Sequence, residues 1–411
     1  MMRLVPFDDL DDLMIYFDEG YKISQDEAYR RFSEIKVVPP EDLPSDPFSA
    51  AYSNKILEIY KKASSRNSYS IVNEVAGFNV DELTVRPFPF FTKSIKLAAQ
   101  HYSLIGKFLG MMDIKSGGSI LECGVGFGNT TLALAMLGCQ VTALDIAESY
   151  CEVVRRRAAL HEVDIKVVHS DFTWIETTEE KYDAVCFFES FHHCWEFERI
   201  LLSLHKVVKP GGKIYFGGEP INMEFPMPWG VRLDGEALFV VRQNGWMELG
   251  FHSDFFEELL FRTGWRGTCV DTHFWYAARK YDPIVISGSD SKIGSNFGTA
   301  AGDALHIDVP VNSQPTFVVY GPYLKLAKGK YRFEYALDPD AQVADTMVVD
   351  ICYSAGQNVI YARQITQDDL TKKLISGEFT LNEKANDLEI RLMVSDGFRA
   401  GIRQLSVQPL D

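Results

Sequence analysis

The sequence lacks several features that would define a secreted or membrane protein. Its 7 cysteines are scattered along 411 residues and form no Cys-x-x-Cys pair, which argues for a reducing compartment rather than a disulfide framework. No apolar run reaches the roughly 18 residues that a membrane helix needs. The N-terminus turns acidic at once and has no signal-peptide apolar stretch. We therefore expect a cytoplasmic protein without membrane insertion.

The chain also has fewer basic than acidic residues. The chain carries 57 acidic and 41 basic residues, for a net charge of -16. Nucleic-acid binding needs clustered Lys and Arg, so we expect no nucleic-acid partner. The hydrophobic fraction of 46% is that of an ordinary globular protein, which predicts a sizeable core. The length exceeds one ordinary domain and favours two.

The pattern of apolar and polar residues changes along the chain and predicts its domains. Residues 1–100 read as a helical N-terminal extension. Residues 101–281 alternate short apolar runs with amphipathic segments, which is typical of a parallel α/β sheet. Within them, residues 253–262 predict a helix with Ser253 as its N-cap. Residues 282–411 contain short alternating runs separated by Gly, Asn, Asp or Pro, which predicts an antiparallel β-sandwich.

A glycine-rich turn separates a predicted strand, 119–123, from a predicted helix, 130–137. Three glycines on alternate residues let the backbone bend sharply and let a ligand approach without interference from Cβ: Gly124, Gly126 and Gly128. A dinucleotide-binding fingerprint would need glycine at position 129, where Asn129 stands. The turn therefore does not match that fingerprint.

Acidic residues accompany the predicted strands at spacings that suit a bound ligand. Glu122 lies directly before the glycines. Asp145 ends the second predicted strand, where a carboxylate can accept hydrogen bonds from both ribose hydroxyls. Asp171 follows the third predicted strand, and the fourth and fifth come after it in order. Either of these aspartates alone could be a helix cap or turn residue, but the ordered set of elements favours a binding site.

This pattern resembles the first motifs of class I methyltransferases that depend on S-adenosylmethionine (SAM). The resemblance implies a Rossmann-like sheet, with Asp171 accepting from the adenine amino group and Phe172 packing on the base. It implies SAM as the cofactor and a set of cofactor-binding residues: Glu122, Gly124, Gly126, Gly128, Asp145, Ile146, Asp171, Phe172 and Glu189.

Two adjacent histidines follow the fourth predicted strand, at the end where substrate and cofactor meet in such sheets. Methyl transfer to a hydroxyl needs a base, and the pKa of histidine suits that role. We favour His192 as the base over His193, with Glu189 orienting the histidine or contacting the methionine end of SAM. Packing or capping roles for both histidines are the alternative.

A metal held by these three residues is a further alternative. Ligands on one short loop need partners from elsewhere, and the sequence shows no second cluster of such residues. We therefore expect no metal.

Outside the SAM motifs, the chain resembles methyltransferases of bacterial surface-polysaccharide and glycan assembly. The resemblance rests on stretches such as 73–74, 86–90, 232–236 and 244–251. It implies O-methylation of a sugar hydroxyl, with an insertion at about 219–250 that helps to bind the acceptor. The expected substrate-binding residues are Arg86, Phe91, Glu219, Trp229, Arg232, Asp234 and Glu236. A lid that packs its aromatic residues on the sheet edge is the alternative.

The expected partner is therefore a glycan or small-molecule acceptor. The tail domain resembles the β-sandwich modules that accompany glycan-active enzymes, and either binds polysaccharide or mediates contacts in a homo-oligomer. Two further alternatives stay open: a methyltransferase for a non-sugar small molecule, and a non-catalytic SAM-binding scaffold that uses its β-sandwich to bind a partner.

Overall fold

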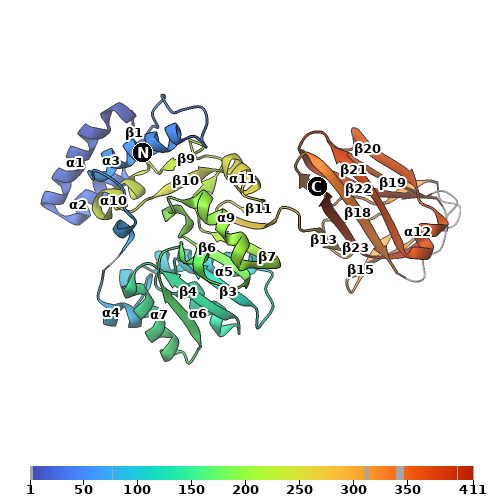
Figure 1. Cartoon of the computed structure of the whole chain (residues 1–411), viewed down its shortest axis with the longest axis horizontal. Helices are drawn as coiled ribbons and strands as arrows, with labels where there is room; N and C mark the ends of the chain where they lie inside the picture. The colour runs from blue at the N-terminus through green and yellow to red at the C-terminus, as the bar shows by residue number, and fades with distance from the viewer. Residues whose placement is uncertain (1–2, 76, 311–313, 339–346, 396, 411) are drawn as a thin grey trace. The chain divides into compact units, whose positions relative to one another are not determined.

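The computed structural model describes residues 3–75, 77–310, 314–338, 347–395 and 397–410. It divides into two compact units, Met1–Arg279 and Lys280–Asp411 (Figure 1). Within the described ranges, no helix is both long and apolar enough to span a membrane.

A seven-stranded sheet organises the first unit, in the order β11-β12-β7-β6-β3-β4-β5. The strands from β7 to β5 run parallel, and β12 lies antiparallel to β7. The bounds of the strands are β3 Ser119–Cys123, β4 Gln140–Asp145, β5 Ile165–His169, β6 Tyr182–Phe188, β7 Val208–Gly217, β11 Trp265–Asp271 and β12 Phe274–Arg279. The predicted Rossmann-like α/β core is confirmed.

Helices connect these strands: α5 Ile95–Met111, α6 Asn129–Met136, α7 Glu148–Leu160, α8 Trp174–Thr177, α9 Phe197–Val207 and α11 Ser253–Arg262. The prediction of Ser253 as the N-cap of α11 was wrong by one residue. His252 has the extended backbone of an N-cap, and its Nδ1 accepts a hydrogen bond of 3.3 Å from the N–H of Asp254.

The N-terminal extension and the 219–250 insertion pack on each other. The extension contains β1 Arg3–Val5, α1 Leu10–Ile23, α2 Gln25–Ser33, β2 Ile35–Val37, α3 Ala50–Ser64, η2 Ile71–Glu74 and α4 Val80–Val85. The insertion contains β8 Ile221–Asn222, β9 Trp229–Val231 and α10 Gly235–Asn244, and β10 Leu249–His252 completes its sheet. The phenol of Tyr52 donates to the carbonyl of Trp229 at 2.8 Å, and that of Tyr60 donates to Gly245 at 2.6 Å. These buried hydrogen bonds tie α3 to both ends of the insertion.

The second unit contains two antiparallel sheets. One has the order β14-β15-β23-β18-β21 with β13 beside β23, and the other has the order β16-β22-β19-β20 with β17 beside β22. Side chains from both sheets share one apolar core, in which the phenol of Tyr335 donates to the carbonyl of Ile390 at 2.7 Å. The elements are β13 Ile284–Ser287, β14 Gly298–Ala301, β15 Ala304–Asp308, β16 Thr316–Val319, β17 Leu324–Leu326, β18 Gly329–Leu337, β19 Met347–Tyr353, β20 Asn358–Gln364, α12 Gln367–Lys372, β21 Leu374–Leu381, β22 Ala385–Val394 and β23 Arg399–Leu410.

Candidate functional site

The three glycines between β3 and α6 have left-handed backbones, with φ of 73°, 50° and 72° at Gly124, Gly126 and Gly128. A Cβ at Gly124 would lie 2.6 Å from the Cβ of Ser190, and one at Gly128 would lie 2.7 Å from a methyl group of Val154. A Cβ at Gly126 would meet no protein atom within 4 Å. The outer two glycines are therefore required by packing, whereas the middle one keeps space open.

A cavity of about 520 Å³ opens beside this turn. Most of the residues predicted to bind cofactor line it: Gly124, Gly126, Asp145, Ile146, Asp171, Phe172 and Glu189. Glu122 and Gly128 are not among the described residues that line the cavity. The cavity therefore gathers residues from the ends of β3, β4, β5 and β6.

Asp145 and Glu122 are both buried carboxyl groups beside this cavity. Asp145 accepts hydrogen bonds from the N–H groups of Gly126 at 3.0 Å and Ala147 at 2.8 Å, and burial raises its pKa to about 6. Glu122 accepts from the hydroxyl of Thr130, and burial raises its pKa to about 7. The other oxygen of Glu122 has no hydrogen-bond partner within the described part of the chain. Asp145, which lines the cavity, fits a ligand that brings hydroxyl donors.

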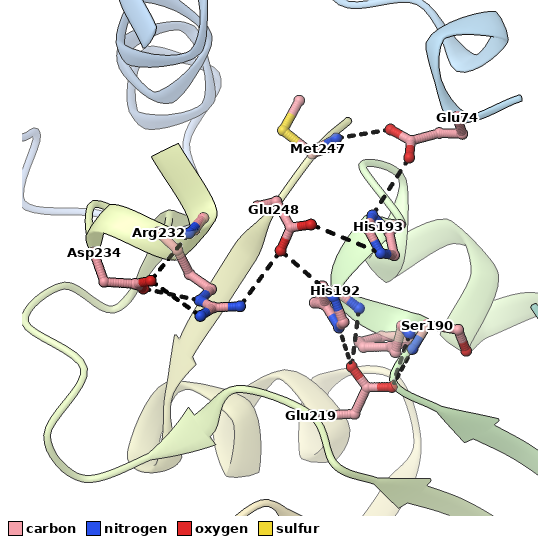
Figure 2. A network of polar contacts seen from close by, with 11 residues as sticks. Glu74, Ser190, His192, His193, Glu219, Arg232, Asp234, Met247 and Glu248 are labelled. Carbon is pink, nitrogen blue, oxygen red and sulfur yellow. Dashed lines mark hydrogen bonds and ion pairs between the residues drawn. The ribbon is translucent and has the colours of Figure 1, made fainter. Parts of the chain in front are cut away.

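The two histidines predicted to act in catalysis lie on one short turn, η4 Phe191–His193, which follows β6 (Figure 2). His193 lines the cavity, and His192 is buried outside its described lining. The Nδ1 of His192 lies 2.7 Å from a carboxylate oxygen of Glu219. The Nδ1 of His193 lies 3.4 Å from Glu74. Burial alone would lower the pKa of His193, but Glu248 and Glu74 outweigh it and raise that pKa to about 9.

Glu219 anchors this turn and does not face the cavity. It is fully buried and accepts hydrogen bonds from the N–H groups of Ser190, Phe191 and His192 at 2.8, 2.9 and 3.1 Å. Burial by itself would raise its pKa, but His192 and these amides outweigh it and lower the pKa. The predicted role of Glu219 in substrate binding is corrected to support of the histidine turn.

Glu248, which precedes β10, joins the two histidines to Arg232. Its carboxylate lies 3.6 Å from the Nε2 of His192 and 4.0 Å from the Nε2 of His193. Arg232 lies 3.4 Å from Glu248 and 3.0 Å from Asp234 (Figure 2). Arg232 and Asp234 therefore belong to an internal ion-pair network.

Trp229 does not form the predicted aromatic platform. It is 3% exposed, its indole N–H donates to the carbonyl of Pro47 at 2.8 Å, and its ring packs against Tyr52 and Phe197. Trp229 therefore fits the alternative prediction, in which the aromatic residues pack inside the structure. The other predicted substrate residues are exposed and stand outside the described cavity lining: Arg86, Phe91 and Glu236.

Comparison with known proteins identifies the region around the glycine turn. The family model of a methyltransferase domain matches residues 120–212. The expected cofactor, SAM, is confirmed for this region, because the family model matches it and a relative named below is SAM-dependent.

Similarity to individual proteins is confined to part of the chain. It is 31% identical over 134 residues to an S-adenosyl-L-methionine-dependent Diels-Alderase of Talaromyces variabilis, covering 32% of this chain and 44% of that protein. It is 27% identical to a ubiquinone biosynthesis O-methyltransferase of Coxiella burnetii, covering 29% and 50%. It is also 27% identical to the 27-O-demethylrifamycin SV methyltransferase of Amycolatopsis mediterranei, covering 33% and 50%.

The chain thus spans about half the length of the curated relatives it matches. Among solved structures, it is similar to a SAM-dependent methyltransferase from Mesorhizobium loti, with 18% identity and a TM-score of 0.35 over 42% of this chain and 96% of the other.

Further residues, which the sequence did not indicate as site residues, also line the cavity. They come from distant segments: Tyr69, Glu74, His101, Trp195 and Trp246. The Nε2 of His101 accepts from the amide of Asn129 at 2.9 Å, and its Nδ1 lies 3.8 Å from Glu189. Burial lowers the pKa of His101. Two of these residues could have been found from the sequence. Glu74 and Trp246 lie in stretches 73–74 and 244–251, which weakly resemble methyltransferases of glycan assembly.

Proposed function

We propose that this chain transfers a methyl group from SAM to a hydroxyl of a sugar, in a glycan or a sugar intermediate. The observation that carries the proposal is a single cavity in which the cofactor residues face an aromatic and acidic wall. Tyr69, Trp195 and Trp246 supply aromatic faces, and Glu74 and Glu196 supply hydrogen-bond acceptors. Flat apolar surfaces with a few polar groups suit the faces and hydroxyls of a sugar ring.

The charge of the cavity favours an acceptor without phosphate groups. Its described lining contains Glu74, Glu189 and Glu196 but no Lys or Arg. Phosphate recognition relies on such cations or on helix N-termini. A neutral glycan or free sugar is therefore favoured over a nucleotide sugar.

Glu189 is the proposed base. Its carboxylate lines the cavity directly after β6, close to the glycine turn. Desolvation in the cavity, together with the nearby carboxylates of Glu219 and Glu236, raises its pKa to about 7, although the side chain is 43% exposed; this pKa suits proton transfer at neutral pH. SAM supplies an electrophilic methyl group on its sulfonium, and Glu189 takes the hydroxyl proton as the acceptor oxygen attacks. His192, favoured from the sequence, and His193 are assigned supporting roles, because their nitrogens face Glu219, Glu74 and Glu248.

An aromatic hydroxyl is the second candidate acceptor. Two similar proteins are named for O-methylation in ubiquinone biosynthesis and for methylation of a rifamycin. The aromatic wall would stack on a phenol as well as on a sugar. Under the sugar proposal, the second unit is a β-sandwich that binds glycan. Its alternative role is contact between copies of the chain.

The test is an acceptor panel. Purified full-length protein is incubated with methyl-labelled SAM and with neutral oligosaccharides, nucleotide sugars or phenols, and S-adenosylhomocysteine release and methyl incorporation are measured. Methyl incorporation into neutral sugars alone supports the proposal, and incorporation into phenols supports the second candidate. SAM binding without turnover on any class of acceptor favours the non-catalytic scaffold.

A further inference from the structure

Two adjacent histidines and a distant glutamate bring three ligand atoms together behind the cavity wall. One ring nitrogen of each histidine, His192 and His193, and one carboxylate oxygen of Glu248 lie within 4.8 Å of one another. Glu248 lies 3.6 Å from the nearer imidazole nitrogen and 4.0 Å from the other. Around a tetrahedral metal ion, such atoms are about 3.3 Å apart, as bond lengths of about 2.0–2.1 Å require. Small side-chain rotations would close the difference.

A second ring of residues holds each of the three groups in place. Glu219 faces the Nδ1 of His192 at 2.7 Å, and Glu74 faces the Nδ1 of His193 at 3.4 Å. Both histidines thus present their Nδ1 atoms to these carboxylates and their Nε2 atoms to Glu248 (Figure 2). Arg232 orients Glu248 from the other side at 3.4 Å. Carboxylates behind histidine ligands are a recurrent feature of metal sites, because they fix the tautomer and orient the ring.

Buried carboxylates surround these atoms. Three carboxylates in the network are buried, with side-chain exposures of 8% for Glu74, 0% for Glu219 and 8% for Glu248. In the network of Figure 2, the single guanidinium is that of Arg232, which is shared with Asp234. His192 is 7% exposed, and its Nε2 lies 3.6 Å from Glu248. Buried carboxylates are costly unless positive charge accompanies them, and a bound metal ion would supply such charge beside Arg232 and the imidazoles.

We propose that His192, His193 and Glu248 bind one divalent transition-metal ion of the Zn²⁺ type through two Nε2 atoms and a carboxylate oxygen. Two imidazoles and one carboxylate suit Zn²⁺, whereas Mg²⁺ prefers oxygen ligands. Since only His193 of the three lines the cavity, the ion lies behind the wall. It ties η4 to the segment before β10 and thereby fixes the acceptor side of the cavity.

Calorimetry on the full, tag-free chain tests the site. The protein carries Cys269→Ser to remove an exposed thiol, is stripped with a chelator and is titrated with ZnCl2, with MgCl2 in a parallel run. We expect saturable 1:1 binding of Zn²⁺ and none of Mg²⁺. Glu248→Gln and His192→Gln should weaken Zn²⁺ binding at least tenfold, and Glu219→Gln should weaken it about 10–100-fold through the second ring. His161→Ala, which removes an exposed histidine on the same unit, is the matched control and should change nothing.

Equal Zn²⁺ affinity in the control and the ligand variants, or no saturable binding, overturns the proposal. SAM affinity is measured on each variant to show that it is folded. A second measurement needs no ligand variant: Co²⁺ added to the stripped protein should give the intense visible absorption of a tetrahedral site, and the weak spectrum of hydrated Co²⁺ would contradict it. Neither assay contains an acceptor, so the outcome is independent of the proposed methyl transfer.

Discussion

The backbone N–H of Gly126 donates a hydrogen bond of 3.0 Å to the carboxylate of Asp145, so that the glycine turn and the end of the neighbouring strand β4 form one unit. The hydrogen bond fixes the carboxylate at the rim of the cavity. Because Gly126 carries no side chain, the space above it stays open to a ligand. Cofactor binding therefore depends on both residues, for different physical reasons.

Gly126→Ala should weaken SAM binding at least tenfold, because its methyl group would enter the cavity. Gly117→Ala is a matched control: Gly117 also has a positive φ, and a Cβ there would meet no atom within 4 Å, but it does not line the cavity. Both variants carry the same kind of backbone strain. Calorimetric SAM titration of the two should separate strain from ligand contact, and equal affinities would contradict the placement of the cofactor.

Asp145 makes SAM affinity depend on pH. Its pKa is raised to about 6, so the carboxylate is ionised above that pH and neutral below it. Ribose hydroxyls donate more strongly to the ionised form, and SAM affinity should fall as pH is lowered from 7.5 to 5. Asp145→Asn should lose about 1–3 kcal/mol of binding at pH 7.5 and flatten the step near pH 6.

Glu122→Gln is the control for this pH dependence. Glu122 is also buried, but it stands behind the cavity lining. The step near pH 6 should survive in this variant. If that step disappears with Glu122→Gln and persists with Asp145→Asn, the ribose contact is misassigned.

The two units should fold separately. A cut between Arg279 and Lys280 follows the division of the structure, and every described residue that lines the cavity precedes it. Residues 1–279 should keep SAM affinity within about twofold of the full chain, since no cavity contact is removed. Residues 280–411 should unfold in one cooperative transition with a β-type circular dichroism spectrum. Aggregation of both pieces would contradict independent folding.

Local sequence patterns predicted the sheet because the determinants of a buried parallel strand are themselves local. The predicted strand at 119–123 coincides with β3, and Asp145 ends β4 as expected. Each of these strands is an apolar run that ends at a turn, and its position in the sheet follows from the order of strands and helices.

The acceptor side of the cavity could not be predicted in this way. Glu74, His193 and Glu248 meet although they are far apart in the chain, and no periodic pattern links them. The sequence predicts Trp229 as a substrate-binding residue, because an aromatic residue near the sheet can either stack on a substrate or pack in the core. The local pattern does not distinguish these two roles. Its burial beside Tyr52 depends on the packing of α3 against the insertion, which only the tertiary structure shows.

Two tryptophans should respond to truncation in opposite ways. Trp229→Ala removes a buried ring and should lower the free energy of unfolding by about 3–5 kcal/mol. Trp246→Ala removes a half-buried ring from the cavity wall and should leave thermal stability nearly unchanged while raising the acceptor KM. Thermal unfolding and steady-state kinetics measure both effects. A stable Trp229→Ala variant with a raised KM would restore Trp229 as the platform.

Glu189→Gln tests the proposed base. Removal of a general base should lower kcat by about 10²–10⁴-fold while SAM affinity stays near that of the unaltered chain. If Glu189 instead binds the methionine end of SAM, the variant should lose SAM affinity, and the two roles are thus separated. Glu196→Gln, which changes another carboxylate of the cavity lining, is the matched control and should retain most of kcat. His192→Ala should also reduce kcat less than Glu189→Gln does, and the opposite ranking would return the base role to the histidine turn.

The pH profile gives the same test without a variant. Because the pKa of Glu189 is raised to about 7, its carboxyl group is protonated and unable to accept a proton below that pH. The rate under saturating SAM should therefore fall about tenfold per pH unit below 7 and level off above it. Glu189→Gln should abolish this slope, since its amide does not titrate. A profile that is flat from pH 5.5 to 8 in the unaltered chain would show that no group with a pKa near 7 takes the proton, and methyl transfer would then depend on positioning alone.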